Sequence, residues 1–198
     1  MARPRAATYD DQREHILARA AEFFARQGYT ATTMNQVAAA CGVTKPTLYH
    51  YFADKQSLLL HIAAGHVARL EMLAAEVRAL DLLPEARLRL LIERFMQAYA
   101  DAQHHHRVLT EDVRFLPEVE RQQVLTAERR VVDGFADAIV ALRPELQGRQ
   151  LHKPLTMLLF GMMNWTFTWL RPDGTLDHQA LGAIVADLFC GGLGAIRA

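Results

Sequence analysis

Hydrophobic residues recur at helical spacing along almost the whole chain, and the alternation typical of strands is nearly absent. The first predicted helix spans residues 10–27, with Ile16, Ala20 and Phe24 on its apolar face. Gly28 follows it, and glycine readily adopts the backbone that ends a helix. The pattern therefore predicts an all-α protein.

Residues 32–55 have the pattern of two short helices joined by a tight turn. Thr33 can cap the first helix and Thr44 the second, because a hydroxyl accepts the free backbone N–H groups of a helix start. Gly42 between them permits a left-handed helix end. The second helix, residues 45–51, is polar and aromatic, so it is expected to face outward. This arrangement is typical of a helix-turn-helix unit, whose second helix enters the major groove of DNA.

The remaining pattern predicts a long fourth helix and a helical body. The fourth helix is expected from residue 55 to about residue 80, where it would join the three-helix head to the body. Further helices are expected over residues 85–103, 107–115, 117–142, 152–170 and 177–196. The last two are separated by a predicted Pro-Asp-Gly turn at residues 171–174.

Three regions follow from this pattern. Residues 1–9 form a basic arm that we expect to be flexible until it meets DNA, residues 10–55 form the DNA-binding head, and residues 56–198 form a helical body.

Composition narrows the class of protein. The chain has 198 residues, of which 51% are hydrophobic, with 22 Lys and Arg against 22 Asp and Glu. It therefore cannot rely on bulk positive charge to find nucleic acid. Residues 1–55 carry seven basic and five acidic residues, a net charge of 7 − 5 = +2. We expect neither a signal peptide nor a membrane span, hence a cytoplasmic protein with no membrane partner, and its two cysteines are expected to be small buried residues.

The segments ILARAAEFFARQGYTATT (residues 16–33) and GVTKPTLYHYFADKQSLL (residues 42–59) resemble the N-terminal signature of TetR-type regulators, the TetR/AcrR family. The resemblance implies a homodimeric transcriptional repressor. It would bind double-stranded, near-palindromic operator DNA and be released by a small-molecule effector. The same resemblance implies that the helical body, residues 56–198, is the ligand-binding and dimerisation domain.

Carried over by position, the resemblance implies specific DNA contacts. Thr33 and Lys55 would bind phosphates. The contacts implied for the recognition helix, to base edges, phosphates or thymine methyls, are Thr44, Lys45, Thr47, Tyr49 and His50. The alternative for each is an ordinary solvated side chain, whereas Leu48 and Phe52 are expected in the core of the head.

The resemblance also implies an effector pocket after about residue 84. Candidate lining residues are apolar or aromatic: Phe95, Met96, Tyr99, Phe115, Phe135, Met157, Phe160, Met163, Trp165 and Trp169. Residues 160–181 resemble a subgroup of these regulators that senses acyl-CoA thioesters, and the cations available for CoA phosphates are Arg114, Arg121, Arg129 and Arg130. The alternatives are plain core packing for the apolar residues and a solvated helix face for the arginines.

The last two predicted helices are more apolar than a surface helix needs to be. In the family, such helices from two subunits form a four-helix bundle. The residues that we assign to this dimer interface are Phe167, Leu188, Gly191 and Gly192. The alternative is a helix pair buried within one chain.

The sequence gives little support for a metal site or for an enzymatic activity. His104, His105 and His106 are consecutive, so on a helix they point about 100° apart and cannot converge on one ion. No nucleophile elbow or phosphate-binding loop is present, so we expect no cofactor, no metal and no enzymatic activity. Two other classes remain: a DNA-binding regulator without a ligand, and a small-molecule-binding protein with a vestigial head.

Overall fold

The structure, a computed structural model, describes residues 8–171 and 174–197. Most of the predicted basic arm and two residues of the predicted Pro-Asp-Gly turn lie outside these ranges. Every regular element in the described ranges is a helix, which confirms the all-α prediction. The chain forms two compact units, which we call the head unit (Met1–His66 and His104–Val124) and the body unit (Val67–Gln103 and Leu125–Ala198).

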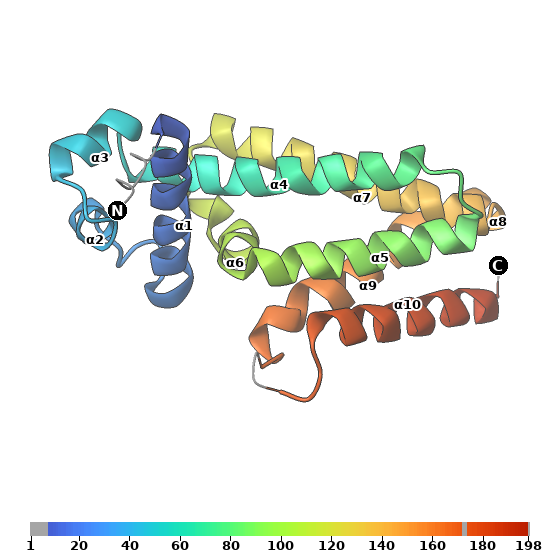
Figure 1. The fold of residues 1–198 in the computed structure, drawn as a ribbon. Coiled ribbons are helices and arrows are strands. Elements are labelled where there is room, and N and C mark those ends of the chain that lie inside the picture. The colour runs from blue at the N-terminus through green and yellow to red at the C-terminus, as the bar shows by residue number, and fades with distance from the viewer. Residues whose placement is uncertain (1–7, 172–173, 198) are drawn as a thin grey trace. The chain divides into compact units, whose positions relative to one another are not determined.

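The head unit is built on three N-terminal helices (Figure 1). Its elements are α1 (Tyr9–Gln27), α2 (Met34–Ala40), α3 (Lys45–Tyr51), the start of α4 (Lys55–Ala79), α6 (Gln103–Asp112) and the 3-10 helix η1 (Val113–Phe115). Ile16 and Phe24 of α1 are fully buried, as their helical spacing predicts. Leu48 of α3 and Phe52 after it are buried with them, which confirms their expected place in the core.

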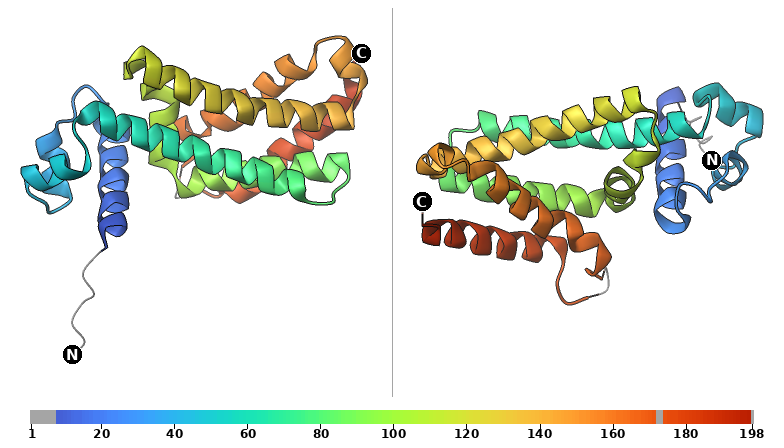
Figure 2. Two further views of the ribbon diagram at one scale, coloured as in Figure 1. Left: turned by 90° about the horizontal axis from the view of Figure 1, so that it is seen from above. Right: turned by 180° about the vertical axis from the view of Figure 1, so that it is seen from behind.

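The body unit contains the later helices. They are α5 (Pro84–Asp101), most of α7 (Glu118–Leu142), α8 (Glu145–Gly148), α9 (His152–Asn164), the 3-10 helix η2 (Trp165–Thr168) and α10 (His178–Ala195). Helices α5 and α10 lie side by side along their length (Figures 1 and 2). Gly182 allows this approach, because a Cβ atom there would lie 3.3 Å from the Cβ of Met96.

Aromatic rings fill the core of the body unit. Phe135 packs edge-to-face against Phe95 and Phe160, with ring centroids 4.8 and 5.0 Å apart. Helices α5, α7 and α9 supply these rings, so the three helices share one core.

Two helix boundaries differ clearly from the sequence prediction, and one short helix was not predicted. Helix α6 begins at Gln103 rather than residue 107, so the three consecutive histidines lie within it. Helix α9 ends at Asn164 and continues as the 3-10 helix η2, where residues to 170 were expected to be α-helical. The short helix α8 was not predicted.

The compact units also group residues differently from the predicted regions. Residues 56–66 and 104–124 belong to the head unit, although the sequence analysis assigned them to the body. Among the described helices, α4 alone is long and apolar enough to cross a membrane by length and composition. Its buried residues, such as Leu58, Ile62 and Val67, recur at helical spacing, as in the core helix of a folded protein.

Candidate functional site

The turn between α2 and α3 is fixed by backbone geometry. Gly42 has a positive φ of 65°, which glycine adopts without steric cost. The N–H of Val43 donates to the carbonyl of Ala38, and the N–H of Gly42 donates to that of Ala39, both at 3.1 Å. These two bonds form a Schellman motif that ends α2 and sets the direction in which α3 leaves.

Helix α3 is capped at its start and anchored along one face. The Thr44 hydroxyl accepts a hydrogen bond from the Thr47 backbone N–H at 3.3 Å, and Pro46 occupies the first turn. Leu48 is completely buried and holds the inner face in the head core. The recognition-helix residues predicted to contact DNA all have exposed side chains: Thr44, Lys45, Thr47, Tyr49 and His50.

The exposed face of α3 offers several kinds of recognition chemistry. The Lys45 ammonium lies 5.8 Å from the centroid of the Tyr49 ring, one helical turn away. The hydroxyls of Thr44 and Thr47 are 2.8 Å apart and share a hydrogen bond. One cation, two hydroxyls and an aromatic edge on one face match what DNA backbones and base edges accept.

Tyr9 is a surface residue that the sequence analysis did not identify. Its ring is 53% exposed, stacks on Tyr51 at 4.6 Å and meets His50 edge-on at 6.3 Å. The start of α1 therefore lies beside the C-terminal end of α3. The only signal in the sequence was an aromatic residue at the end of the predicted basic arm (residues 1–9), although Tyr9 is in fact the first residue of α1.

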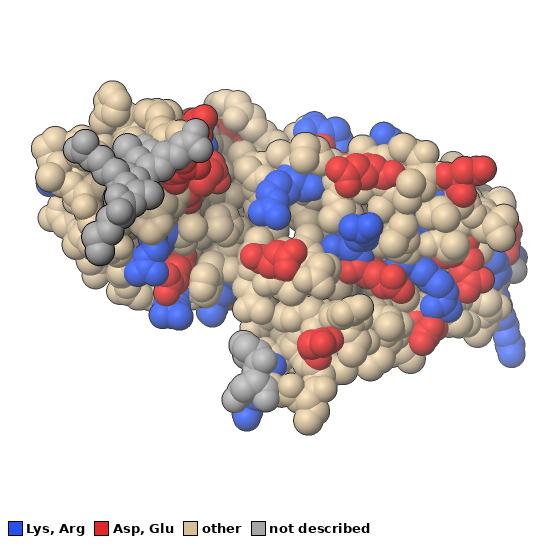
Figure 3. Space-filling view, viewed as in Figure 1, with Lys and Arg blue, Asp and Glu red and all other residues tan. Residues whose placement is uncertain are grey.

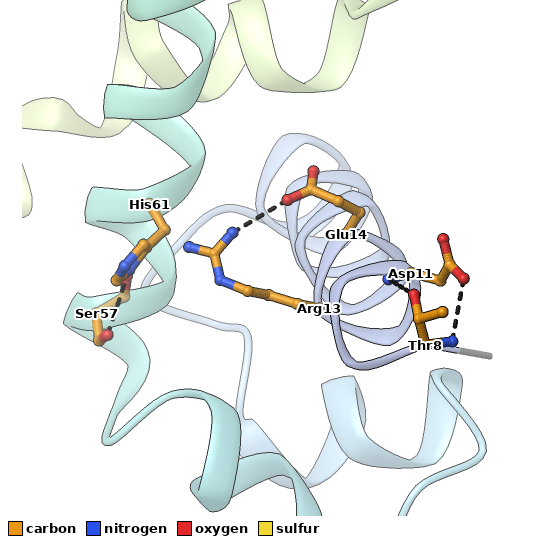
Figure 4. Close-up of polar contacts among 6 residues, drawn as sticks. All are labelled: Thr8, Asp11, Arg13, Glu14, Ser57 and His61. Atoms are coloured by element: carbon orange, nitrogen blue, oxygen red, sulfur yellow. Dashed lines mark hydrogen bonds and ion pairs between the residues drawn. The ribbon is translucent and has the colours of Figure 1, made fainter.

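Figure 4 shows polar contacts within α1, between Thr8 and Asp11 and between Arg13 and Glu14, and within the start of α4, between Ser57 and His61. The Thr8 hydroxyl accepts from the Asp11 N–H at 3.2 Å, and Asp11 accepts from the Thr8 N–H at 3.0 Å, which completes a capping box. Arg13 donates to Glu14 at 3.0 Å, and its guanidinium carbon lies 5.5 Å from the Phe52 ring centroid. Helix α1 is thus tied to the residue that ends α3.

Two other predicted DNA contacts have partners within the head unit. The hydroxyl of Thr33 and the side chain of Gln36 form a capping box at the start of α2, although Thr33 stays exposed. The Lys55 ammonium donates to the carbonyls of Tyr29, Thr30 and Thr32 at 2.8, 3.3 and 2.9 Å. The phosphate roles assigned to both residues remain predictions.

Helix α6 contributes buried ionisable groups to the same unit. His106 is 3% exposed, and its Nδ1 lies 3.4 Å from the Nε2 of His66. Burial, reinforced by the His66 charge, lowers the pKa of His106 to about 3, so this ring is neutral at physiological pH. Burial also raises the pKa of Asp112 to about 6. In the described parts of the chain, no three His, Cys, Asp or Glu side chains are placed to hold a metal ion.

Family models match both parts of the chain. The model described as bacterial regulatory proteins, tetR family, matches residues 16–62, which contain α2 and α3. The model described as tetracyclin repressor-like, C-terminal domain, matches residues 81–193, more than half of the chain. The chain belongs to the TetR family. It is therefore a transcriptional regulator, from a family whose members are not enzymes.

Individual TetR-family proteins resemble the chain over nearly its whole length. A TetR-family transcriptional regulator from Bordetella parapertussis 12822 is 34% identical, with a TM-score of 0.88 over 96% of this chain and 100% of that one. The transcriptional activator FasR of Mycolicibacterium smegmatis is 26% identical over 188 residues, which are 93% of this chain and 84% of FasR. The transcriptional repressor KstR2 of Mycobacterium tuberculosis is 24% identical over 205 residues, 95% of this chain and 96% of KstR2.

A further protein of the same fold, AibR, was solved in complex with a small molecule and with operator DNA. The structure of AibR in complex with isovaleryl coenzyme A and operator DNA is 22% identical, with a TM-score of 0.77 over 89% of this chain and 97% of that one. At this identity the likeness shows the shared fold.

The residues predicted to line an effector pocket fall into three groups. Six are buried in the core of the body unit: Phe95, Met96, Tyr99, Phe135, Phe160 and Met163. Three are largely exposed: Met157, Trp165 and Trp169. Phe115 belongs to the head unit, where its ring stacks on Tyr29 at 5.3 Å. The structure therefore does not bring all ten together, and their role as a pocket stays a prediction.

A groove of about 640 Å³ lies elsewhere in the body unit, between α4, α5 and α7. Small and apolar side chains line part of it: Ala74, Ala75, Leu91, Val131, Gly134, Ala138 and Ala141. Charged side chains line the rest: Glu71, Arg78, Arg87, Arg130, Asp133 and Asp137. None of the ten apolar or aromatic residues predicted to line a pocket is among them, but Arg130, one of the four arginines suggested for CoA phosphates, is.

The arginines of the groove differ in how they are held. Arg130 is ion-paired with Glu71, and Arg87 donates to the backbone carbonyls of Leu80 and Leu82. Arg78 makes no ion pair with a residue in the described ranges. On the face in Figure 3, basic and acidic side chains are interspersed, and no large area of one sign is seen there.

Helices α9 and α10 expose apolar side chains at helical spacing. On α9 these are Met157, Leu158 and Met162, followed by Trp165, and on α10 they are Ile184 and Leu188. Of the predicted interface residues, Leu188 is 65% exposed, Gly191 and Gly192 are exposed, and Phe167 is half-buried. We call the exposed side chains of α9, α10 and Trp165 the apolar surface of the body unit.

Proposed function

We propose that this TetR-family regulator is a ligand-responsive repressor that binds a near-palindromic operator as a homodimer in the bacterial cytoplasm. The observation that carries the proposal is α3. A Schellman turn sets its direction, buried Leu48 fixes its inner face, and its polar outer face is exposed. A helix held in this way suits insertion into a major groove.

The side chains of α3 suggest how the contacts divide. Lys45 can bind a phosphate or a base edge, and the hydroxyls of Thr44 and Thr47 can do the same. Tyr49 and His50 can contact phosphate or a thymine methyl group. Tyr9 joins this set because its exposed ring lies against His50. Thr33 remains a proposed phosphate contact at the start of α2.

Dimerisation is proposed through the apolar surface of the body unit. One recognition helix reads only a few base pairs, so helix-turn-helix proteins gain affinity by pairing two of them. Six large exposed apolar side chains, five on α9 and α10 and one, Trp165, on η2, are costly to leave in water. Burial against a second copy would remove that cost, with Phe167, Leu188, Gly191 and Gly192 at the interface.

The effector is proposed to be a slender apolar molecule that carries an anion, such as an acyl-CoA thioester. AibR, which has the same fold, binds isovaleryl coenzyme A. In the present chain, the groove between α4, α5 and α7 has small apolar walls and three arginines. The walls suit an acyl chain, and Arg78 suits a phosphate or carboxylate.

Release from DNA follows from differential binding. An effector shifts the population only if it binds the form that does not fit the operator more tightly than the form that does. A roughly 10⁴-fold preference is needed to move the equilibrium from about 1:99 to about 99:1. The effector must therefore be sensed by a part of the body that differs between the two forms.

Activation is the second candidate, because FasR is described as an activator. Both functions need the same α3 contacts, and they differ in where the bound dimer lies relative to the promoter. A transcription reporter decides between them: deletion of the gene raises expression for a repressor and lowers it for an activator.

The test is a mobility-shift titration on the DNA upstream of the gene, with and without a panel of acyl-CoA thioesters. Specific binding that one thioester releases supports both parts of the proposal. Specific binding that no thioester disturbs supports the DNA-binding function and contradicts the proposal that the effector is an acyl-CoA thioester. If neither this DNA nor a genome-wide selection yields a specific site, the chain is a small-molecule-binding protein with a vestigial head.

A further inference from the structure

Lys55 is the first residue of α4, and its ammonium group is enclosed by the turn between α1 and α2. Its Nζ donates to the carbonyls of Tyr29, Thr30 and Thr32, at distances between 2.8 and 3.3 Å. An ammonium has three N–H donors, so three carbonyl acceptors use all of them. The same Nζ lies 4.4 Å from the centroid of the Tyr29 ring, a cation–π contact.

Within the turn that Lys55 binds, the Thr32 N–H also donates to the Tyr29 carbonyl, at 3.3 Å. Gly28 ends α1 with a positive φ of 86°, and the Thr32 hydroxyl donates to the Gly28 carbonyl at 3.0 Å. The carbonyls of residues 29, 30 and 32 converge on one point, where their dipoles would repel one another without a cation. Thr33, the next residue, is the N-cap of α2. Lys55 thus binds the segment that leads directly into the N-cap of α2.

Tyr29 extends this arrangement into the core of the head unit. Its ring meets Phe24 of α1 edge-on at 5.2 Å and stacks on Phe115 of η1 at 5.3 Å. The ring is 8% exposed, and burial raises the pKa of its hydroxyl. The turn is thus fixed by packing on one side and by the Lys55 ammonium on the other.

The location of Lys55 at the N-terminus of α4 is unfavourable for a lysine that only adds charge to the surface. A cation at a helix N-terminus opposes the helix dipole, which favours anions there. The three carbonyl dipoles of the turn offset that cost. To reach a phosphate, Nζ would have to give up three charge-assisted hydrogen bonds, and the Tyr29 carbonyl would keep only the Thr32 N–H, at 3.3 Å, as a donor.

We infer that Lys55 is a positioning residue for the helix-turn-helix rather than a phosphate ligand. It holds the α1–α2 turn, and through the turn it fixes α2 and the helix α3 that α2 supports. This inference rests on the proposed DNA-binding function. It replaces the phosphate contact implied for Lys55 by the family resemblance.

Salt dependence separates the two roles. Each phosphate contact adds about 0.9 to the slope of log K against log salt, so a dimer that loses one per subunit loses about 1.8. For Lys55→Met, binding of the full-length dimer to its operator should weaken at least ~10-fold at every salt concentration, with an unchanged slope. The matched control is Lys45→Ala, an exposed lysine of α3, which should reduce the slope if it binds phosphate.

Lys55→Arg gives a second, independent comparison. Arginine binds phosphate at least as well as lysine, but its planar fork cannot direct three donors at carbonyls that surround one point. A positioning role predicts weakened binding with an unchanged slope, whereas a phosphate role predicts wild-type affinity. A reduced slope for Lys55→Met, or full affinity for Lys55→Arg, overturns the inference.

Amide hydrogen exchange measured in the absence of DNA tests the positioning role of Lys55 independently of whether the protein binds an operator. In folded Lys55→Met, or in Lys55→Arg if the first variant does not fold, amides of residues 29–40 should exchange ~10-fold faster while those of α5 stay unchanged. Unchanged exchange at residues 29–40 overturns the inference whether or not the wild type binds DNA. Failure of the wild type to bind any site, with faster exchange in the variants, defeats the proposed function alone.

Discussion

At the scale of single residues, adjacent positions of α3 have different roles: one packs in the core and its neighbours face the solvent. Leu48 is fully buried in the head core, whereas Thr47 and Tyr49 on either side of it are exposed. The division follows from helical geometry, since adjacent residues point about 100° apart. A substitution on the exposed face should change DNA binding, and one at Leu48 should unfold the head.

Asp112 gives the head unit a pH dependence that can be measured. The side chain is 6% exposed, and burial, with a smaller effect from Glu111, raises its pKa to about 6 against an ordinary value near 4. The unfolded chain therefore loses this proton at lower pH than the folded chain. Ionisation destabilises the fold as pH rises from about 4 to about 6, and the loss persists above pH 6.

Asp112→Asn should remove this cost. At pH 7.5 we expect the variant to be more stable by on the order of 1 kcal/mol, after allowance for solvent screening, which raises Tm by about 3 °C. At pH 4 the two proteins should unfold at the same temperature. Calorimetry at both pH values measures this, with Asp81→Asn, an exposed loop carboxylate, as the control. A gain that is equal at both pH values would contradict the assignment.

At the scale of elements, the sequence predicted helices well where local signals mark their ends. Helix α3 begins after Thr44, whose hydroxyl accepts a backbone N–H as predicted. Helix α10 was predicted from residue 177 and begins at His178, after the cap Asp177, whose carboxylate accepts from the Ala180 N–H. The same holds for α4, predicted to start at Lys55 and observed over Lys55–Ala79. Side-chain caps and glycine stops are local, so they can be recognised without knowledge of the fold.

The boundaries that sequence analysis missed depend on tertiary contacts or competing local bonds. Helix α6 begins early because buried His106 packs against His66, which is 40 residues away along the chain. Helix α9 tightens into η2 where the hydroxyls of Thr166 and Thr168 donate to the carbonyls three residues before them. Neither signal is visible in hydrophobic periodicity.

The binding surfaces were predictable to different degrees. The exposed residues of α3 follow from the helix-turn-helix pattern. The groove in the body unit does not, because alanine, glycine and paired charges look like an ordinary helix surface in sequence. Tertiary placement alone brings Ala74 of α4 and Gly134 of α7 to one groove.

Arg78 tests whether this groove is the effector site. Arg78→Ala should weaken effector binding by about 1.5 to 3 kcal/mol, roughly 10- to 100-fold, because it removes a charge-assisted hydrogen bond to the anion. Operator affinity without effector should not change. Calorimetric titration with the thioester identified in the mobility shift measures the loss, and Arg69→Ala, an exposed arginine of α4 outside the groove, is the control. Equal binding by Arg78→Ala and wild type would exclude an anion contact at Arg78.

At the scale of the whole molecule, operator recognition depends on the association of two chains. We propose that the apolar surface of the body unit mediates this association, because Leu158, Trp165 and Leu188 are each more than 60% exposed in the single chain. Such side chains gain most when a partner removes them from water.

Leu188→Glu should convert the dimer to a monomer at micromolar concentration. A carboxylate buried in an apolar interface costs about 3 kcal/mol or more, roughly a 100-fold increase in the dimer Kd. Sedimentation equilibrium measures the change. Leu83→Glu is the matched control, because Leu83 is 79% exposed at the start of α5, outside that surface. A Leu188→Glu protein that remains dimeric would place the interface elsewhere.

The most direct test of DNA recognition by α3 is a titration of the full-length protein against its upstream operator and a scrambled duplex of equal length. Measured by fluorescence anisotropy over a salt series, the operator should bind about 10³-fold or more tightly than the scrambled duplex, with a steep loss of affinity as salt rises. Lys45→Ala and Tyr49→Ala should each narrow that ratio without unfolding the protein. Equal affinity for the two duplexes, or wild-type discrimination by both variants, would contradict the proposal that the exposed face of α3 reads DNA.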